Sequence, residues 1–234
     1  MWKLNVRVIE AGSCTIDPGN IASREYVALK HQLGIGGGST VTIIGENDEL
    51  LLVDTGYDHE SDVSQANKEN NWNKLKMSLQ LNGIDPDDIT KVFVTHFHRD
   101  HFGCIEYFEN AEWYCHNIAL ANFDDPIKGK FILINDGDYI LHNTLVIATP
   151  GHTQGHSSIL WSDRNRTVRV AIAGDAIINL AWLQSGYIWK FNSDFLCTET
   201  TRDSIKRILN ECDIVVPGHG QPFFVTERLM RIFA

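Results

Sequence analysis

The segment Thr95-His96-Phe97-His98-Arg99-Asp100-His101 places four side chains of the metal-ligand type within six consecutive positions. His96 and His98 lie two residues apart, so an extended chain would project both from the same side. Asp100 and His101 follow directly. Imidazole and carboxylate together suit zinc first, and iron or manganese next. A solvated polar loop with one catalytic histidine is the alternative, but ligand-type side chains this close together favour a metal site.

The segment comes directly after the apolar residues 92–94, at the carboxyl end of an expected strand, where open α/β sheets place their sites. Three more expected strands end in a comparable way, and they are followed by His152, Asp175 and His219. Each of these residues has a glycine beside it, which permits a sharp turn. Any one alone could be a turn histidine or a helix-capping aspartate. Jointly, the strand ends deliver five histidines and two aspartates, enough for two metal ions.

Two periodicities alternate along the chain and predict an α/β protein. Val- and Ile-rich runs are typical of strands, which we expect at residues 4–8, 41–45, 50–54, 91–95, 130–134, 144–148, 157–161, 167–173 and 213–216. Helical spacing of apolar residues predicts helices at 72–79 and at 205–212. Between them, Asp85 with the following proline and acids is typical of a helix start, and we expect a short closing helix at 226–233. Thr200 and Thr201 are candidate caps of the third helix. No linker divides the chain, so we expect a single domain over residues 1–234.

Two stretches show neither pattern. Residues 10–38 carry a glycine cluster (Gly34, Gly36, Gly37 and Gly38) without the strand and helix that flank a phosphate-binding motif, so a loop is favoured. Residues 181–200 are unusually aromatic and follow the strand that ends at Asp175. Tyr187 and Trp189 are therefore candidate contacts in a substrate pocket. Large aromatic residues are equally typical of an ordinary core or of a homodimer contact.

Composition limits the function classes. Of 234 residues, 43% are hydrophobic and 21% charged, which excludes disorder, collagen and coiled coil. The net charge of −10, from 20 Lys and Arg against 30 Asp and Glu, disfavours broad nucleic-acid binding. Two bound divalent ions would change this charge to about −6 and could attract an anionic substrate locally.

The compartment is expected to be the cytoplasm. The N-terminus lacks the apolar stretch of a secretory signal, and no run approaches the roughly 18 apolar residues of a membrane span. Five cysteines without a C-x-x-C pair favour reduced thiols over disulfides or a zinc ribbon. We therefore expect a soluble protein with no membrane partner.

The order of the seven candidate ligands resembles that of the metallo-β-lactamase fold hydrolases, whose pattern is HxHxDH, then His, then Asp, then a last His. The resemblance extends from residue 51 to His219. It implies a four-layer αβ/βα sandwich with two mixed sheets and helices outside. It also implies the ligand sets: His96, His98 and His152 for a first metal, Asp100, His101 and His219 for a second, and Asp175 between them. Asp54 would orient the ligands, and His156 and Ser157 would support them.

Departures from individual branches favour a compact, single-domain type. His98, His101 and Asp175 differ from the patterns of flavodiiron proteins, class B1 β-lactamases and class B3 β-lactamases, respectively. Few residues follow His219, so we expect no helical substrate domain of the glyoxalase II kind. Residues 82–89 are similar to the N-acyl homoserine lactonases, although the Tyr that follows the bridging aspartate in those enzymes has no counterpart at residues 176–179.

The resemblance implies a binuclear metal-dependent hydrolase, with two divalent ions that are expected to be zinc, or else iron or manganese. A metal-bridging hydroxide would attack a small-molecule ester, lactone or thioester, and Asp100 would orient it and take up its proton. The alternative is a metal-dependent phosphodiesterase or endoribonuclease. The charge balance disfavours that alternative, since only small basic groups such as Lys128 with Lys130 are present. A non-catalytic metal-binding protein is a third possibility, which the complete ligand set disfavours.

Overall fold

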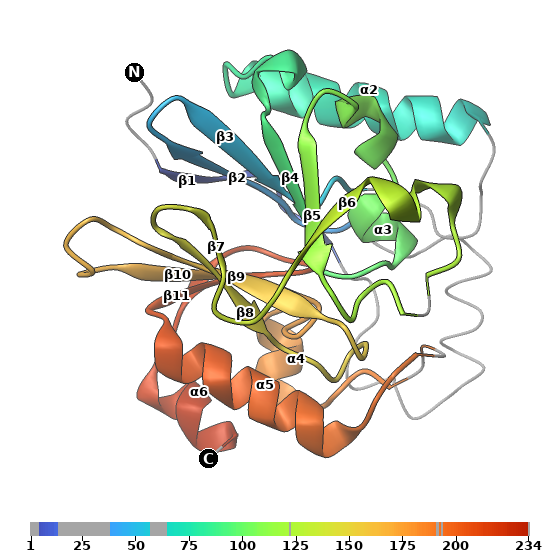
Figure 1. Cartoon of the computed structure of the whole chain (residues 1–234). Coiled ribbons are helices and arrows are strands. Elements are labelled where there is room, and N and C mark those ends of the chain that lie inside the picture. The colour runs from blue at the N-terminus through green and yellow to red at the C-terminus, as the bar shows by residue number, and fades with distance from the viewer. Residues whose placement is uncertain are drawn as a thin grey trace.

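Two six-stranded sheets face each other in the computed structural model, which describes residues 5–13, 38–56, 65–121, 123–190, 192 and 194–233 (Figure 1). The first sheet contains β1 (Val6–Glu10), β2 (Val41–Glu46), β3 (Glu49–Val53), β4 (Lys91–Val94), β5 (Glu112–His116) and β6 (Phe131–Ile134), in that order. The second contains β12 (Phe223–Phe224), β11 (Ile214–Pro217), β10 (Arg169–Gly174), β9 (Ser157–Ser162), β8 (Thr144–Ala148) and β7 (Tyr139–Leu141).

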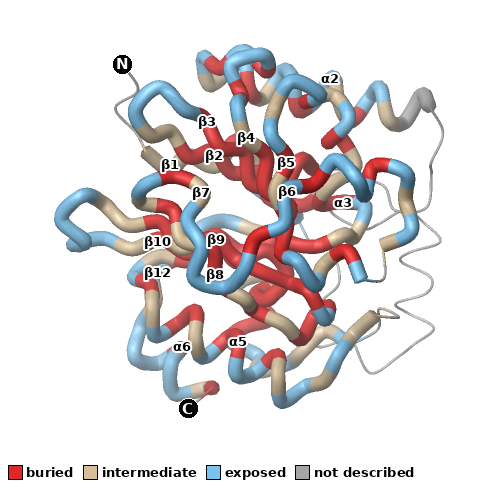
Figure 2. Tube along the Cα trace, viewed as in Figure 1, coloured by how far each residue is buried: buried red, intermediate tan, exposed pale blue. Residues whose placement is uncertain are grey.

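Helices cover the outer face of each sheet (Figures 1 and 2). The α-helices are α2 (Gln65–Leu81), α3 (Arg99–Phe102), α4 (Leu180–Ser185), α5 (Thr198–Glu211) and α6 (Glu227–Ile232). Short 3₁₀ helices are η2 (Pro86–Asp88), η3 (Ile105–Phe108) and η4 (Pro126–Lys130). The layers therefore run helix, sheet, sheet, helix, and both sheets mix parallel and antiparallel pairs. This confirms the expected four-layer α/β sandwich.

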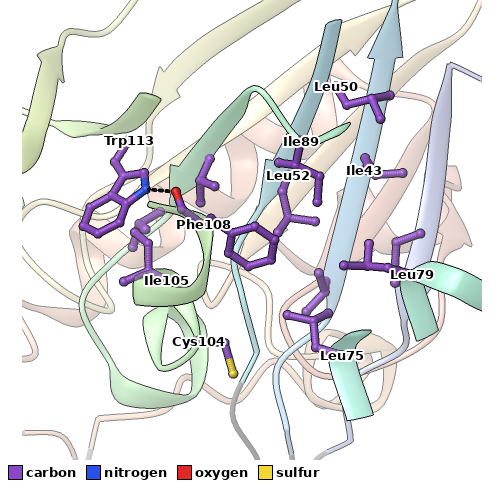
Figure 3. Close-up of a cluster of buried hydrophobic side chains, with 14 of the residues drawn as sticks. Ile43, Leu50, Leu52, Leu75, Leu79, Ile89, Cys104, Ile105, Phe108 and Trp113 are labelled. Carbon is purple, nitrogen blue, oxygen red and sulfur yellow. Dashed lines mark hydrogen bonds between the residues drawn. The ribbon is translucent and has the colours of Figure 1, made fainter. Parts of the chain in front are cut away.

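Strand β3 shows how the sequence builds the layers. Successive side chains of a strand point to opposite faces, and here both faces are buried. Leu50 and Leu52 pack toward α2, beside Leu75 and Leu79 (Figure 3). Leu51 and Val53 point the other way, into a core between the sheets that also contains Ile172 and Val216. A third core lies between the second sheet and helices α5 and α6.

Strand direction explains why the polar strand ends meet. β3 and β4 are parallel in one sheet, and β10 and β11 are parallel in the other. Two antiparallel steps through β9 give β8 the direction of β10. The residues that follow these five strands therefore come from carboxyl ends, which is where α/β sheets place their ligands.

Most expected elements are present, with several corrections. Thr200 and Thr201 do not cap α5, because the helix begins earlier and the Cys197 sulfur accepts from the Thr200 amide. The helix expected from Asp85 onward is only the turn η2, although Asp85 does cap it. The stretch 181–200 is not wholly irregular, since it includes most of α4 and the start of α5. Leu4, Gly34, Gly36 and Gly37 lie outside the described residues.

Two further observations concern the cysteines and the helices. Cys104, Cys115 and Cys212 are buried free thiols, Cys197 is half-buried, and Cys14 lies outside the described residues. No helix in the described part of the chain is long and apolar enough to cross a membrane.

Candidate metal centre

The seven candidate ligands gather in two adjoining groups. One contains His96, His98, His152 and Asp175, and the other contains Asp100, His101 and His219. Within each group the donor atoms all lie within 4.8 Å of one another. Six of the seven side chains are buried, and His98 is half-buried. The structure thus brings together every residue for which the sequence predicted a ligand role.

In the first group, three imidazole nitrogens converge. Nδ1 of His98 lies 3.0 Å from Nε2 of His96 and 3.0 Å from Nε2 of His152. A neutral imidazole has one donor and one acceptor nitrogen. Nδ1 of His98 is therefore either the donor or the acceptor in these contacts, and it cannot be both. Oδ2 of Asp175 lies 3.3 Å from Nε2 of His152 and 3.9 Å from Nε2 of His96.

The second group shares Asp175 with the first. Oδ1 of Asp175 lies 3.2 Å from Nε2 of His101 and 3.3 Å from Nε2 of His219. Oδ2 of Asp100 lies 3.3 Å from Nε2 of His219 and 3.7 Å from Nε2 of His101. One carboxylate oxygen of Asp175 therefore faces each group, and the bridging role that the resemblance implied stays a prediction.

Divalent cations would satisfy these donor atoms better than hydrogen bonds among the atoms do. Within the described residues, Oδ1 of Asp100, Nε2 of His101 and Oδ1 of Asp175 are buried without a hydrogen-bond partner. Leaving such groups unpaired costs about 1–3 kcal/mol each, and more when they are charged. Imidazole and carboxylate are ligands of zinc, iron and manganese. Two divalent cations at these positions would satisfy the unpaired atoms.

Burial and neighbouring charges separate the histidines into two kinds. Burial lowers the pKa of His152 to about 3. Burial, followed by the charges of His101 and His98, holds the pKa of His96 well below its ordinary value. Burial opposes protonation of His101 too, but the carboxylates of Asp175, Asp100 and Asp54 outweigh it and raise that pKa well above the ordinary value. In the metal-free protein, protons on some of these histidines therefore balance the buried carboxylates.

The metal-free protein should lose stability as the pH falls below 6.5. His152 has a folded-state pKa of about 3, against 6.5 for an ordinary histidine. Between these values the unfolded chain binds a proton that the folded chain does not, so the free energy of unfolding should fall by about 3 kcal/mol from pH 7 to pH 4. Urea unfolding in a chelator at pH 7, 5 and 4 measures this loss. His152→Gln should reduce it, and an unfolding midpoint that does not change with pH would contradict the assignment.

Asp54 contacts residues beside both ligand groups, and the orienting role that the resemblance implied for it stays a prediction. Its Oδ2 lies 2.7 Å from Nδ1 of His101 and also accepts from the Thr95 hydroxyl at 2.9 Å. The same hydroxyl lies 3.1 Å from Nδ1 of His96. Asp54 also accepts from the Thr95 amide, and its φ of 59° is unusual for a residue other than glycine. A strained turn that is fixed by three hydrogen bonds therefore directs Nε2 of His96 and His101 toward the site.

His156 and Ser157 lie beside the ligands but belong to neither group. Nδ1 of His156 lies 2.9 Å from the Thr149 hydroxyl, and its Nε2 accepts from the Ala176 amide. The Ser157 amide donates to the carbonyl oxygen of Thr95. These contacts connect β9 to the segments that carry His96 and Asp175, and the supporting role of both residues stays a prediction.

Two polar residues near the site were not predicted from the sequence. Oδ1 of Asp194 lies 3.1 Å from Nε2 of His98. The side-chain amide of Asn192 donates to Oδ1 of Asp194 at 2.8 Å and to the His152 carbonyl oxygen at 2.6 Å. His98 and Asn192 lower the pKa of Asp194 below its usual range, although burial opposes this. Neither residue ends a strand or falls in a motif, so no local signal in the sequence marks them.

The aromatic residues of the 181–200 stretch divide between core and site. Trp182 is buried. Tyr187 and Trp189 line a small cavity whose wall also includes the ligands His152 and Asp175. The cavity is also lined by Ala176, Ile177, Ile178, Leu183, Ile188, Thr201, Ile205 and Phe233. The two candidate pocket residues therefore lie next to the candidate metal ligands, and their contact with a substrate stays a prediction.

Gly218 is required by the close approach of the strand ends. A Cβ at this position would overlap Oδ1 of Asp175 and lie 2.9 Å from the Gly174 carbonyl oxygen. Gly218→Ala should therefore displace Asp175, lower metal content and reduce the free energy of unfolding by about 1–3 kcal/mol. Gly129→Ala is the control, because nothing lies within 4 Å of its added methyl group. Metal analysis and urea unfolding of both variants test this, and full metal content in Gly218→Ala would contradict it.

The fold and the site together define a class: α/β sandwiches with two groups of histidine and aspartate at the carboxyl ends of their strands. Residues 34–219 match the Metallo-beta-lactamase superfamily, and the chain belongs to it. A solved structure of a candidate metallo-beta-lactamase from Thermotoga maritima superposes with a TM-score of 0.65 at 22% identity, covering 94% of this chain and 98% of that one. At this identity, the likeness shows the fold.

Two relatives illustrate the range of similar sequences. Metallo-beta-lactamase domain-containing protein 1 of Xenopus laevis is 32% identical over 165 residues, which cover 67% of this chain and 66% of that protein. The chain covers less than two thirds of this relative and of its mouse and rat counterparts. Hydroxyacylglutathione hydrolase of Citrobacter koseri is 31% identical over 120 residues, covering 50% of this chain and 40% of that enzyme.

Proposed function

We propose that this chain is a hydrolase that uses two divalent metal ions, most suitably zinc, to cleave a small-molecule ester, lactone or thioester. The observation that carries the proposal is the position of Asp175, whose two oxygens face the two ligand groups at 3.2–3.3 Å from His101, His219 and His152. A shared carboxylate keeps two cations close together, as in binuclear hydrolytic sites.

The relatives support hydrolysis and favour a carbonyl substrate. The Metallo-beta-lactamase superfamily consists mostly of metal-dependent hydrolases. One similar protein is named as a hydrolase of hydroxyacylglutathione, which is a thioester. Since that match covers 50% of this chain, it supports the type of bond and leaves the substrate open.

The chain's own residues would bind the ions and accept the proton that the attacking water releases. Divalent ions at such a site lower the pKa of water toward neutrality and polarise a substrate oxygen. Asp100 has two carboxylate oxygens, Oδ2 beside Nε2 of His219 and Oδ1 without a hydrogen-bond partner within the described residues, so one would hold an ion while the other accepts a proton from the attacking water. Burial opposes ionisation of Asp100, but His101 and His219 outweigh it and hold its pKa below the usual value. The carboxylate is therefore ionised at neutral pH, as an acceptor must be.

The cavity beside the first ligand group suits an apolar part of a substrate. Its lining is mostly aliphatic and aromatic, with Tyr187 half-exposed at 53%. We propose that Tyr187 and Trp189 contact the substrate there.

We also propose a cytoplasmic location, because the three buried free thiols suit a reducing compartment.

Cleavage of a phosphodiester is the alternative function, since the same two ions could bind it. The chain's net charge of −10 works against a nucleic-acid substrate. One small basic group combines Lys128 and Lys130, and Lys130 already lies over the Trp113 ring at 5.0 Å.

A substrate panel tests the proposal. The full chain is assayed with a generic thioester, a lactone, a nitrophenyl ester and bis-nitrophenyl phosphate, each with zinc or manganese. We expect at least one carbonyl substrate to be hydrolysed with a kcat/KM about 10-fold or more above that for the phosphodiester. Asp175→Ala serves as the control for contaminating hydrolases. Cleavage of the phosphodiester alone would overturn the proposal in favour of the alternative.

A further inference from the structure

His98 is the candidate ligand that packing fixes least. Its side chain is 24% exposed, whereas those of His96 and His101 are fully enclosed. An imidazole ring held loosely can rotate, and it can carry its proton on either nitrogen. For such a ring to bind a metal ion well, a hydrogen bond must fix both the orientation of the ring and the nitrogen that carries the proton.

The geometry shows which nitrogen faces the site. Nδ1 of His98 points to the other histidines of its group, 3.0 Å from Nε2 of His96 and of His152. Nε2 points away from them, to Oδ1 of Asp194 at 3.1 Å. A metal-binding nitrogen must be unprotonated, so the ring proton must lie on Nε2. Asp194 is placed to accept that proton in a hydrogen bond, and thus favours the required form.

Asn192 connects this contact to a second ligand. Its side-chain amide donates both to Oδ1 of Asp194, at 2.8 Å, and to the carbonyl oxygen of His152, at 2.6 Å. Nearby, the Leu196 amide donates to the Gly151 carbonyl oxygen at 2.9 Å. The segment after α4 therefore binds the His152 turn and supports His98 at the same time.

The two ligand groups consequently have separate supporting carboxylates. Asp54 is buried and holds Nδ1 of His101 at 2.7 Å. Asp194 is half-buried and holds His98, at a sequence separation of 96 residues. Partners of this kind typically change metal affinity or activity 10–100-fold when they are removed.

We infer that Asp194 is a positioning residue for the first metal position, where it fixes the ring of His98, and that Asn192 joins it to His152. The inference rests on the metal-binding part of the proposed function and is independent of the substrate. It predicts that loss of Asp194 weakens the first position and leaves the second unchanged.

Zinc titration of single-position variants of the full chain tests this prediction. His219→Ala impairs the second group, and His98→Ala impairs the first. In the His219→Ala background, adding Asp194→Ala should lower zinc affinity about 10–100-fold, measured against a chromophoric chelator. In the His98→Ala background the same change should have less than about a 3-fold effect, because its partner is already absent. Asp203→Ala, an exposed aspartate on α5, is the matched control and should have no effect in either background.

An equal effect of Asp194→Ala in both backgrounds, or none in either, would overturn the inference. The ring of His98 provides a readout that does not depend on zinc binding. In the zinc-free chain, at a pH where the ring is neutral, long-range ¹H–¹⁵N correlations should show the proton on Nε2. Asp194→Ala should shift part of the population to Nδ1, and an unchanged tautomer would also count against the role. A chain that binds zinc as described but hydrolyses nothing would defeat the proposed function alone.

Discussion

Asp175→Ala should lower kcat/KM for the active substrate more than about 100-fold, since loss of a ligand's supporting partner alone typically costs 10–100-fold. Oδ1 of Asp175 lies 3.2 Å from Nε2 of His101, and Oδ2 lies 3.3 Å from Nε2 of His152. A single side chain thus contributes to both groups. Its removal should weaken both metal positions, whereas removal of any histidine should affect one position first.

The fold should survive this change. Oδ1 of Asp175 has no hydrogen-bond partner within the described residues, and its close contacts are with His101 and His219, so alanine chiefly removes contacts within the site itself. The charges of His219, His101 and His152 offset the effect of burial and keep its pKa well below the usual value. The pKa of His101 and of His219 should accordingly fall in the variant, because Asp175 contributes to raising both.

Three measurements check this prediction: steady-state kinetics, metal content per chain and the circular dichroism spectrum. Asp203→Ala is the control, because that side chain is exposed on α5. Activity within a few-fold of the unaltered chain, with two ions still bound, would show that Asp175 does not bridge the groups. If the variant loses its folded spectrum, the metal assignment is tested instead by the metal content of Gly218→Ala and the zinc affinity of Asp194→Ala.

Three of the candidate ligands could be located from the sequence because each follows an apolar run. A buried strand has a clear pattern, and the residue after it is fixed by that pattern. His152, Asp175 and His219 were identified in this way, and the structure places them at the ends of β8, β10 and β11. The grouping then follows from strand direction, which the sequence does not show but which the resemblance implied.

Asp194 could not be predicted by the same reasoning. It lies in a loop, 96 residues from His98, and only the path of the chain after α4 brings them together. The cap of α5 illustrates a similar limit. Serine and threonine are the usual caps, so Thr200 and Thr201 were expected, but the helix begins with the half-buried Cys197 sulfur as acceptor. Short edge strands such as β7 and β12 were also missed, because few residues carry their pattern.

Removal of the metal ions should abolish hydrolysis and lower stability together. Within the described residues, Oδ1 of Asp100, Nε2 of His101 and Oδ1 of Asp175 have no hydrogen-bond partner, and bound ions would supply one. Ions that bind the folded chain alone stabilise it by RT ln(1 + [L]/Kd), which is about 2.7 kcal/mol at a concentration 100 times Kd. Binding should also release protons, since His101 and His219 have raised pKa values and must be deprotonated to act as ligands.

Dialysis against a chelator, followed by zinc addition in steps, measures these effects on one sample. Activity should fall below about 1% and return in full near two ions per chain, because both ligand groups face the shared carboxylate. Over the same steps, the urea midpoint should rise and protons should appear in weakly buffered solution at pH 7. Magnesium is the matched control, since it prefers oxygen ligands and retains its waters. Full activity after one ion, or activity that persists in the chelator, would show that hydrolysis does not need the paired site.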